Sequence, residues 1–440
     1  MKKILLSIIV ILLSINLMAQ SLTLDEAKRL ALKNNPDLLA QEQSTKASKN
    51  NLWKSYINLF PSASLNGNYV KYDDPVLMGP SPVEETQSYG YTVSQPLFNG
   101  GKIWLGARMA NDGYKISKES LNIKNLSTIA DVESKYFNVL ENKNLLEISK
   151  KDLHSSQTNV DIAQVRYDSG TLSKAELLQF QSKLAGKEVS LIQMENLYQI
   201  SLLALANFLQ VEEIKELDEI PIETHQLTLD KLCNKSLPEL DGMIETIVNI
   251  GKVNNPSLKI SKISVDTNKK SLLMAGGNFL PSVNLQYSNN WSKYDIQDEY
   301  EESGQLGINL SVPIFPLVDN GLEIAKANHN LKQSKYALET VSDGIKLSLQ
   351  SSLINLVAAA KTVKSSKLAM EYSQETYDQM KERFALGVNT ANDLLFVEVM
   401  FTSAQNQYTS SFYNYLRAKS NLMLIMGEEN PQILEKIINK

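Results

Sequence analysis

Apolar and polar residues alternate along four short stretches of the chain. In the first stretch Ala63, Leu65 and Tyr69 alternate with serine and asparagine, and in the third stretch Val283 and Leu285 alternate with the same polar types. A period of two predicts β-strands that have one apolar and one polar face. The expected strands cover about 62–72, 88–97, 282–292 and 305–313.

Two kinds of sheet show this alternation. A soluble sheet that is half buried against a core has it, and so does a membrane strand of about ten residues. The polar face of these strands is almost wholly Ser, Asn, Gln and Thr, which suits a wet channel interior. Aromatic residues gather at the strand ends, as they do at membrane interfaces. These features favour membrane strands, and the soluble sheet stays open as the alternative.

A helical pattern follows each pair of strands and is unusually long. Apolar residues recur every seven positions from Val132 through Val139 and Leu146 to Val160, which predicts helices packed along a seam. The first such helix would extend roughly 100 Å at ~1.5 Å per residue. We expect one hairpin from helices at 101–168 and 173–210, a second from helices at 320–386 and 390–426, and shorter helices at 23–33, 36–59, 240–253 and 256–279.

Four short motifs occur in the same order in both halves of the chain. Two of them recur at a shift of 220 residues and two at a shift of 217. The pairs are Asn35-Pro36 with Asn255-Pro256, Phe60-Pro61 with Leu280-Pro281, Gln95-Pro96-Leu97-Phe98 with Val312-Pro313-Ile314-Phe315, and Arg166-Tyr167-Asp168-Ser169-Gly170 with Arg383-Phe384-Ala385-Leu386-Gly387. Ordered repetition of this kind predicts a duplicated structural unit. The expected organisation is a signal peptide at 1–19, a first repeat at 20–210, an inter-repeat collar at 211–239, a second repeat at 240–427 and a C-terminal tail at 428–440.

The first residues have the features of a secretory signal peptide. Lys2 and Lys3 precede an apolar run from Ile4 to Leu17, and cleavage after Ala19 fits the small-residue requirement of signal peptidase. The run is shorter than the ~20 residues of a membrane helix, so export is expected, with a retained anchor as the alternative.

The charge and the reactive residues argue against several classes of function. A net charge of −5 without a basic block gives no electrostatic reason to bind nucleic acid. Cys233 is the single cysteine, and the three histidines (His154, His225 and His329) lie far apart. We find no glycine-rich phosphate loop, metal-ligand spacing or nucleophile elbow, so neither a cofactor nor an enzymatic activity is expected.

The chain resembles the TolC-type outer-membrane efflux proteins in its signal peptide, its duplication, its strand pairs and its helical hairpins. The most specific features are the run Pro96-Leu97-Phe98-Asn99-Gly100-Gly101 and the Arg-aromatic-x-x-Gly turns that begin at Arg166 and Arg383. The resemblance covers essentially the whole chain after the signal peptide.

The resemblance implies a mainly α-helical protein with a transmembrane β-barrel. Three identical chains would form a twelve-stranded barrel in outer-membrane lipid that continues into a twelve-helix tunnel across the periplasm. Four strands cannot close a barrel alone, and an open sheet edge facing lipid is costly, so several chains must pool their strands, which agrees with the homotrimer that the resemblance implies. The implied function is a passive exit duct, in efflux or type I secretion, for substrates delivered by an inner-membrane transporter and a periplasmic adaptor.

The same resemblance implies roles for the hairpin turns. The turns would dock the adaptor through Arg166, Tyr167, Gly170 and Thr171 in the first hairpin and through Arg383, Phe384, Gly387 and Val388 in the second. Acidic residues after each turn would narrow the tunnel, and Glu176 and Asp393 match those positions. The family's gating arginine and its second acid are replaced here by Asn389 and Phe396, which weakens the expected latch. The arginines and acids could equally serve only the helix ends.

The competing interpretation is a periplasmic coiled-coil adaptor or another structural protein. An adaptor also carries a signal peptide and a helical hairpin. It should have one hairpin between soluble β-rich domains, whereas this chain has two hairpins that each follow a strand pair.

Overall fold

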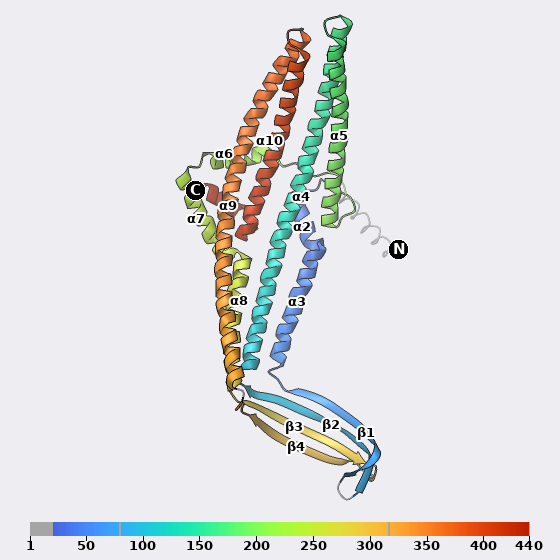
Figure 1. The fold of residues 1–440 in the computed structure, drawn as a ribbon, viewed down its shortest axis with the longest axis vertical. Helices are drawn as coiled ribbons and strands as arrows, with labels where there is room; N and C mark the ends of the chain where they lie inside the picture. Colours follow the sequence, from blue (N-terminus) through green and yellow to red (C-terminus); the bar gives the residue numbers. More distant parts are fainter. Residues whose placement is uncertain (1–20, 79–80, 316, 440) are drawn as a thin grey trace, which may run out of the picture. The chain divides into compact units, whose positions relative to one another are not determined.

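The computed structural model describes residues 21–78, 81–315 and 317–439, so the expected signal peptide at 1–19 lies outside the described residues. The chain is mainly helical (Figure 1). It divides into two compact units. The hairpin unit contains the segment that ends at Ala40, the segment Asn122–Asn255 and the segment that begins at Asp343. The strand unit contains Gln41–Leu121 and Pro256–Ser342. Each unit therefore combines segments from both halves of the chain.

The strand unit contains a four-stranded antiparallel sheet in the order β1-β2-β3-β4. The strands are β1 (Ser62–Met78), β2 (Ser81–Asn99), β3 (Ser282–Tyr294) and β4 (Glu301–Ser311). β1 and β2 are longer than the alternation predicts, because backbone pairing continues past Asp73 and Asp74, where the alternation ends. A register shift between Lys71 and Val76 accommodates the extra residues, as a β-bulge does.

The register places apolar and polar side chains on opposite faces of the sheet. Val93, Tyr287 and Leu306 lie opposite one another across β2, β3 and β4. On the other face the Asn284 amide donates to the Ser94 hydroxyl at 3.0 Å. The apolar face lies open in the single chain, where Leu65 is 87% exposed. The alternation therefore predicted the two faces correctly.

Four helices join this sheet. They are α3 (Pro36–Ile57), the first part of α4 (Lys102–Asp168), α8 (Pro256–Gly276), which a short 3₁₀ turn (η2, Gly277–Phe279) extends, and the first part of α9 (Leu317–Ala385). Pro36 and Pro256 open their helices, where a missing N–H has no cost. Gly100 and Gly277 bring the end of β2 against the end of α8, since a Cβ on either would overlap the carbonyl of the other.

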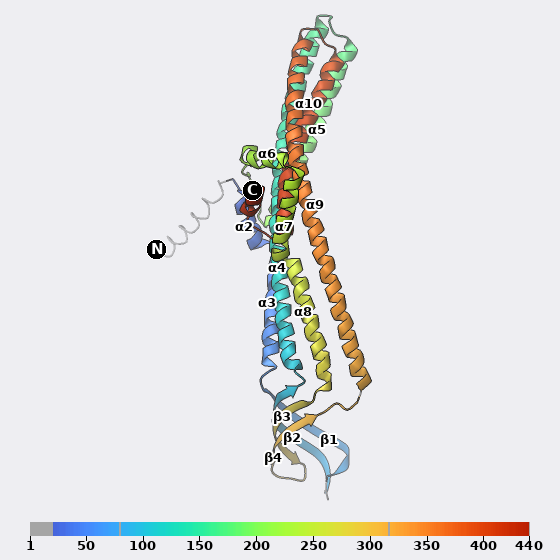
Figure 2. The ribbon, with the colours of Figure 1, turned by 90° about the vertical axis from the view of Figure 1, so that its left-hand side faces the viewer.

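The hairpin unit contains two long helical hairpins, α4 with α5 (Lys174–Leu209) and α9 with α10 (Ala391–Met426) (Figure 2). Its core packs the seam residues of α4, such as Val132 and Tyr136, with Leu356 of α9 and Phe412 of α10. The Tyr136 hydroxyl lies 2.8 Å from the carbonyl oxygens of Leu22 and Asp218. Burial raises the pKa of Tyr136 above its usual value.

Short helices complete the hairpin unit. They are α2 (Leu24–Asn34), the 3₁₀ turn η1 (Ile222–His225), α6 (Gln226–Asn234), α7 (Leu237–Asn254) and α11 (Pro431–Asn439). α11 contacts α6 and α7, and Leu229, Leu232 and Leu434 join the same core. α7 begins before the expected residue 240 because Ser236 and Glu239 form a capping box. Among the described helices, none is long and apolar enough to span a membrane.

Candidate functional site

The two hairpin turns share one backbone conformation. Gly170 and Gly387 both have a φ of +77°, which glycine adopts without strain. In the first turn the Thr171 amide donates to the Arg166 carbonyl at 2.8 Å, and in the second Val388 donates to Arg383 at 2.9 Å. These bonds are those of a Schellman motif, which ends a helix at a glycine.

The acids after each turn cap the returning helices. Glu176 accepts hydrogen bonds from the Ser173 amide at 2.9 Å and from its hydroxyl at 2.7 Å. Asp393 accepts from the Thr390 amide at 3.0 Å and from its hydroxyl at 2.7 Å. The backbone and hydroxyl donors of Ser173 lower the pKa of Glu176, and the hydroxyl and backbone donors of Thr390 lower the pKa of Asp393. The helix-end role considered for both acids is therefore present in the structure.

The two arginines make different contacts. Arg166 crosses to the other hairpin, where Nη1 donates to the Phe384 carbonyl at 3.1 Å and the guanidinium lies 4.6 Å from the centre of the Phe384 ring. Its Nη2 also donates to the Thr171 carbonyl in its own turn at 3.2 Å. Arg383 stays within its own turn and donates to Asn389 Oδ1 at 3.1 Å. Arg166 therefore links the two tips, and Arg383 supports one.

The aromatic residues at equivalent positions also differ. Tyr167 is 36% exposed, and the Lys174 ammonium lies 5.3 Å from its ring centre. Phe384 is fully buried and packs against Phe180, with ring centres 5.3 Å apart. Val388 and Arg383 are exposed. Phe384 therefore belongs to the small core beneath the tips, and the exposed tip surface comes from its neighbours.

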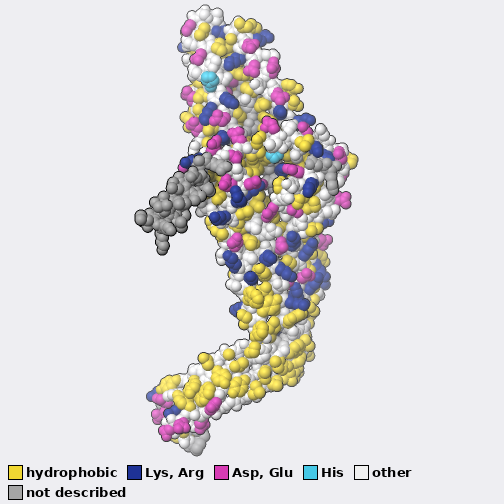
Figure 3. All heavy atoms as spheres, turned by 180° about the vertical axis from the view of Figure 1, so that it is seen from behind, with side chains coloured by type: hydrophobic (Ala, Val, Ile, Leu, Met, Phe, Trp, Pro, Cys, Tyr) yellow, Lys and Arg dark blue, Asp and Glu magenta, His cyan; other side chains and the backbone are white. Residues whose placement is uncertain are grey.

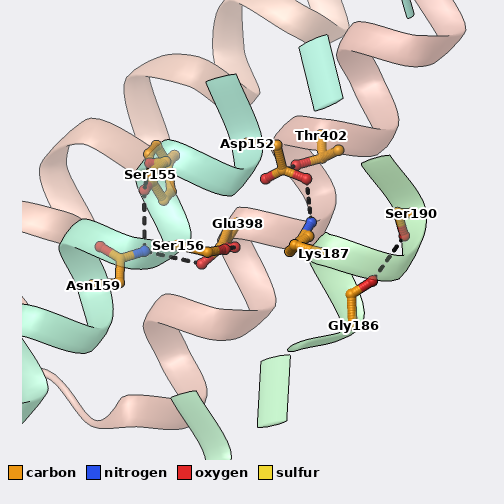
Figure 4. A network of polar contacts seen from close by, with 10 residues as sticks. Asp152, Ser155, Ser156, Asn159, Gly186, Lys187, Ser190, Glu398 and Thr402 are labelled. Carbon is orange, nitrogen blue, oxygen red and sulfur yellow. Dashed lines mark hydrogen bonds and ion pairs between the residues drawn. The ribbon is translucent and has the colours of Figure 1, made fainter. Parts of the chain in front are cut away.

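A buried polar cluster joins the two hairpins below this core (Figure 4). Glu398 of α10 is 2% exposed and accepts hydrogen bonds from two residues of α4. The donors are Ser156 Oγ at 2.7 Å and Asn159 Nδ2 at 3.0 Å. The Tyr377 hydroxyl of α9 lies 2.7 Å from Ser155 Oγ. A buried carboxylate needs such donors because burial without them is costly.

An ion pair lies in the same part of the hairpins. Lys187 of α5 pairs with Asp152 of α4, and Thr402 of α10 donates to Asp152 at 3.0 Å. Figure 4 shows Asp152 beside Thr402 and joined to Lys187. The side chains of the ion pair are only 14% and 10% exposed. Three helices are therefore held together by one carboxylate.

The sequence interpretation did not identify these polar groups. Glu398 stands between Val397 and Val399, and an acid inside an apolar run was a usable signal for a buried carboxylate. Its partners on α4 were not recognisable, because they lie more than two hundred residues away and appear in sequence as ordinary polar positions of a long helix.

Comparisons with known proteins agree with this fold. The model of the outer membrane efflux protein family matches residues 28–209 and 249–428. Outer membrane protein TolC of Salmonella enteritidis is 21% identical over 431 residues, which cover 95% of this chain and 84% of that protein. Alkaline protease secretion protein AprF of Pseudomonas aeruginosa is 22% identical over 330 residues, covering 73% of this chain and 66% of that protein.

Solved structures share the arrangement of the chain. The CmeC outer membrane channel of Campylobacter jejuni superposes with a TM-score of 0.76 at 17% identity, over 95% of this chain and 89% of that one. Identity this low shows the fold alone. The match to the family model shows family membership as well as fold, because its two segments cover both strand pairs and both hairpins. The chain belongs to the outer membrane efflux protein family.

Proposed function

We propose that three copies of this chain form a passive exit duct in the outer membrane. An inner-membrane transporter and a periplasmic adaptor would deliver substrates to it. Family membership identifies the chain as an outer-membrane efflux or secretion channel protein, and it does not favour the adaptor alternative. The family is named for efflux, and its relative AprF is named for the secretion of alkaline protease, so the proposal covers both kinds of export.

The open edges of the sheet are the observation that supports the trimer. Within the described residues, β1 and β4 each pair on one side only, so the sheet has two open edges. Unpaired edge groups cost several kcal/mol each in lipid, and closure is the way to remove them. If β4 of one chain pairs with β1 of the next, three chains supply twelve strands. The apolar face would then meet lipid, and the face with Ser94 and Asn284 would line the lumen.

The hairpins would form the tunnel below this barrel. In this proposal the two repeats each supply one strand pair and one helical hairpin, and the segment 211–239 and the tail 428–440 form a collar. The turns at Gly170 and Gly387 would meet the adaptor. Glu176 and Asp393 would gather six carboxylates near the tunnel entrance, and their capping bonds are compatible with that role because both side chains keep contact with solvent.

The mass of the assembled protein tests the trimer. Cross-linking and native mass measurement of the full protein in detergent should give three chains that separate on heating. A monodisperse monomer with the same β content would overturn the proposal.

The lipid face is tested by a matched pair of variants. Leu285→Arg should impair membrane insertion, because a cation on the lipid face costs about 2–4 kcal/mol near the bilayer midplane. Its neighbour Asn284→Arg should insert normally, since its side chain would face water. Equal insertion of both variants, measured by fractionation and heat-modifiable migration, would contradict a lipid-facing sheet.

A further inference from the structure

All four helices that join the sheet repeat one surface pattern. Each carries an exposed apolar side chain near the strands and a cation four residues farther from them. The pairs are Trp53 with Lys49 on α3, Trp104 with Arg108 on α4, Leu273 with Lys269 on α8, and Leu322 with Lys326 on α9. In α3 and α8 the cation comes first in sequence, and in α4 and α9 it comes second. The pattern therefore follows distance from the sheet, whichever way the chain runs.

The members of this pattern are accessible in the single chain. Trp53 is 59% exposed, Trp104 52% and Leu322 64%. Four residues of helix correspond to about 6 Å, or roughly one turn. The Arg108 guanidinium lies 3.5 Å from the centre of the Trp104 ring. The four pairs thus form an apolar band next to the strands and a cationic band one turn beyond it.

The charges of the strand unit are divided in the same way. Its helical segments, 41–61, 102–121, 256–281 and 317–342, hold fourteen Lys and Arg and seven Asp and Glu. Its strand segments, 62–101 and 282–316, hold two Lys and nine Asp and Glu. Figure 3 shows a face on which hydrophobic side chains cover the strands and the adjoining helix ends, with Lys and Arg gathered on the helices next to them. Positive charge therefore borders the apolar band on its helical side.

We propose that these four pairs, the headgroup band, bind the phosphate groups of anionic phospholipids in the leaflet nearest the helices. Tryptophan is enriched at the membrane interface, and Lys and Arg extend from apolar surface toward polar headgroups. Arg108 can hold a phosphate with two parallel hydrogen bonds. The inference rests on the proposed function, because it requires the sheet to cross lipid.

The charge of the band favours phospholipid over a second protein copy. Contact with another copy of this face would place cations opposite cations, as Lys49 against Lys326, whereas phosphate complements them. Lys269 and Lys326 do pair with Asp266 and Glu323 on their own helices, at 2.9 and 3.3 Å. Exposed pairs within one helix contribute little, so they leave both ammonium groups available to a phosphate.

The first experiment uses the three tryptophans of the chain, Trp53, Trp104 and Trp291. Full-length variants that keep one tryptophan, with phenylalanine at the other two positions, are reconstituted in phospholipid brominated close to the headgroup. Trp104 emission should be strongly quenched. Trp291, in β3, reports separately whether the strands enter lipid.

The two signals separate the two ideas. If Trp291 is quenched by lipid brominated along the acyl chain and Trp104 is not quenched by either lipid, the headgroup band is overturned and the membrane sheet stands. If neither tryptophan is quenched by any brominated lipid, the proposed function fails and the inference fails with it.

The second experiment measures lipid choice. Lys49→Gln, Arg108→Gln, Lys269→Gln and Lys326→Gln are combined, and a control combines Lys346→Gln, Lys361→Gln, Lys364→Gln and Lys367→Gln on α9 of the hairpin unit. Native mass spectrometry compares phosphatidylglycerol with phosphatidylcholine bound to each protein. Each cation near an anionic surface contributes roughly fivefold, so the wild type and the control should retain a phosphatidylglycerol preference that falls at least ~5-fold in the first variant. Equal preference in all three proteins would overturn the inference.

Discussion

The turns at Gly170 and Gly387 have the same backbone and different surroundings. Both end a helix with a glycine of equal φ and begin the next with a capping box. Arg166, however, reaches across to Phe384, while Arg383 stays in its own turn. Phe384 is buried, and its counterpart Tyr167 is not. Local turn chemistry thus follows the repeat, whereas contacts between the hairpins make the two tips unequal. An adaptor that met both tips would meet two different surfaces.

The largest expected difference between the tips comes from their aromatic residues. Phe384→Ala should destabilise the tip core by about 3–5 kcal/mol, because it removes a fully buried ring. Tyr167→Ala should change stability by less than about 1 kcal/mol, since its ring is partly exposed. Hydrogen exchange of the tip amides in the full-length protein measures both. Equal losses of protection would mean that the tips are equivalent after all.

Replacing either turn glycine should act equally on both tips. A Cβ meets no atom within 4 Å at Gly170 and only Arg166 Nη2 at 3.8 Å at Gly387, so the cost of Gly170→Val or Gly387→Val is set by φ. We expect about 1–3 kcal/mol for each. The trimer should persist in detergent while efflux and adaptor pull-down are lost.

The control for these variants is Gly186→Ala on α5, where space is open and the backbone is helical, so stability should rise slightly. Wild-type efflux in both valine variants would show that the adaptor does not dock through these turns. Loss of the trimer along with efflux would do the same.

The arginines should show a smaller inequality. Arg166→Ala removes two hydrogen bonds to carbonyls and a contact with the Phe384 ring, and should cost about 1–2 kcal/mol. Arg383→Ala should cost about 0.5 kcal/mol, as for an exposed side chain. Arg166→Lys should not restore the lost stability, because one ammonium group cannot reproduce the two guanidinium nitrogens that donate to two different carbonyls. Exchange of the tip amides again provides the measurement, and full rescue by lysine would contradict the assigned geometry.

The smallest effect should be the pH dependence of the two caps. The folded pKa values of Glu176 and Asp393 lie below their usual values of 4.5 and 3.8. A carboxyl group whose pKa is lower in the folded state stabilises the fold at pH values above its unfolded-state pKa. That stabilisation is lost as the pH falls through the folded-state pKa. Tip protection, corrected for intrinsic exchange, should therefore decline below about pH 4.5. Glu176→Gln with Asp393→Asn should abolish the decline.

The same double variant separates capping from tunnel lining. If the carboxylates also line the entrance, planar-bilayer recordings should show a cation preference that the variant reduces, because converging negative charge concentrates cations. Unchanged selectivity would leave the acids with their capping role alone.

The long helices and the turns were predictable from local patterns. Sevenfold apolar spacing and two glycines place α4, α5, α9 and α10 within three residues of their observed bounds. The strand ends were less predictable, because pairing in β1 continues where side-chain alternation has stopped. Of the site, the capping acids follow from their positions after the turns. The burial of Phe384 and the partners of Glu398 depend on which helices pack together. A single sequence does not show which helices pack together.

The Glu398 cluster also makes the two halves of the chain unequal. At the shift of 217 residues that relates the tips, the counterpart of Glu398 is Gln181 and the counterpart of Asn159 is Thr376, both exposed. A chain built from two copies of the second half would keep a serine, Ser373, at the position of Ser156, and it would bury Glu398 without the amide of Asn159. Losing one of the two donors to a buried carboxylate costs about 1–3 kcal/mol. Two copies of the first half would lack the carboxylate altogether. In the proposed trimer, replacing each chain by two identical single repeats would therefore lose the contact between Glu398 and Asn159.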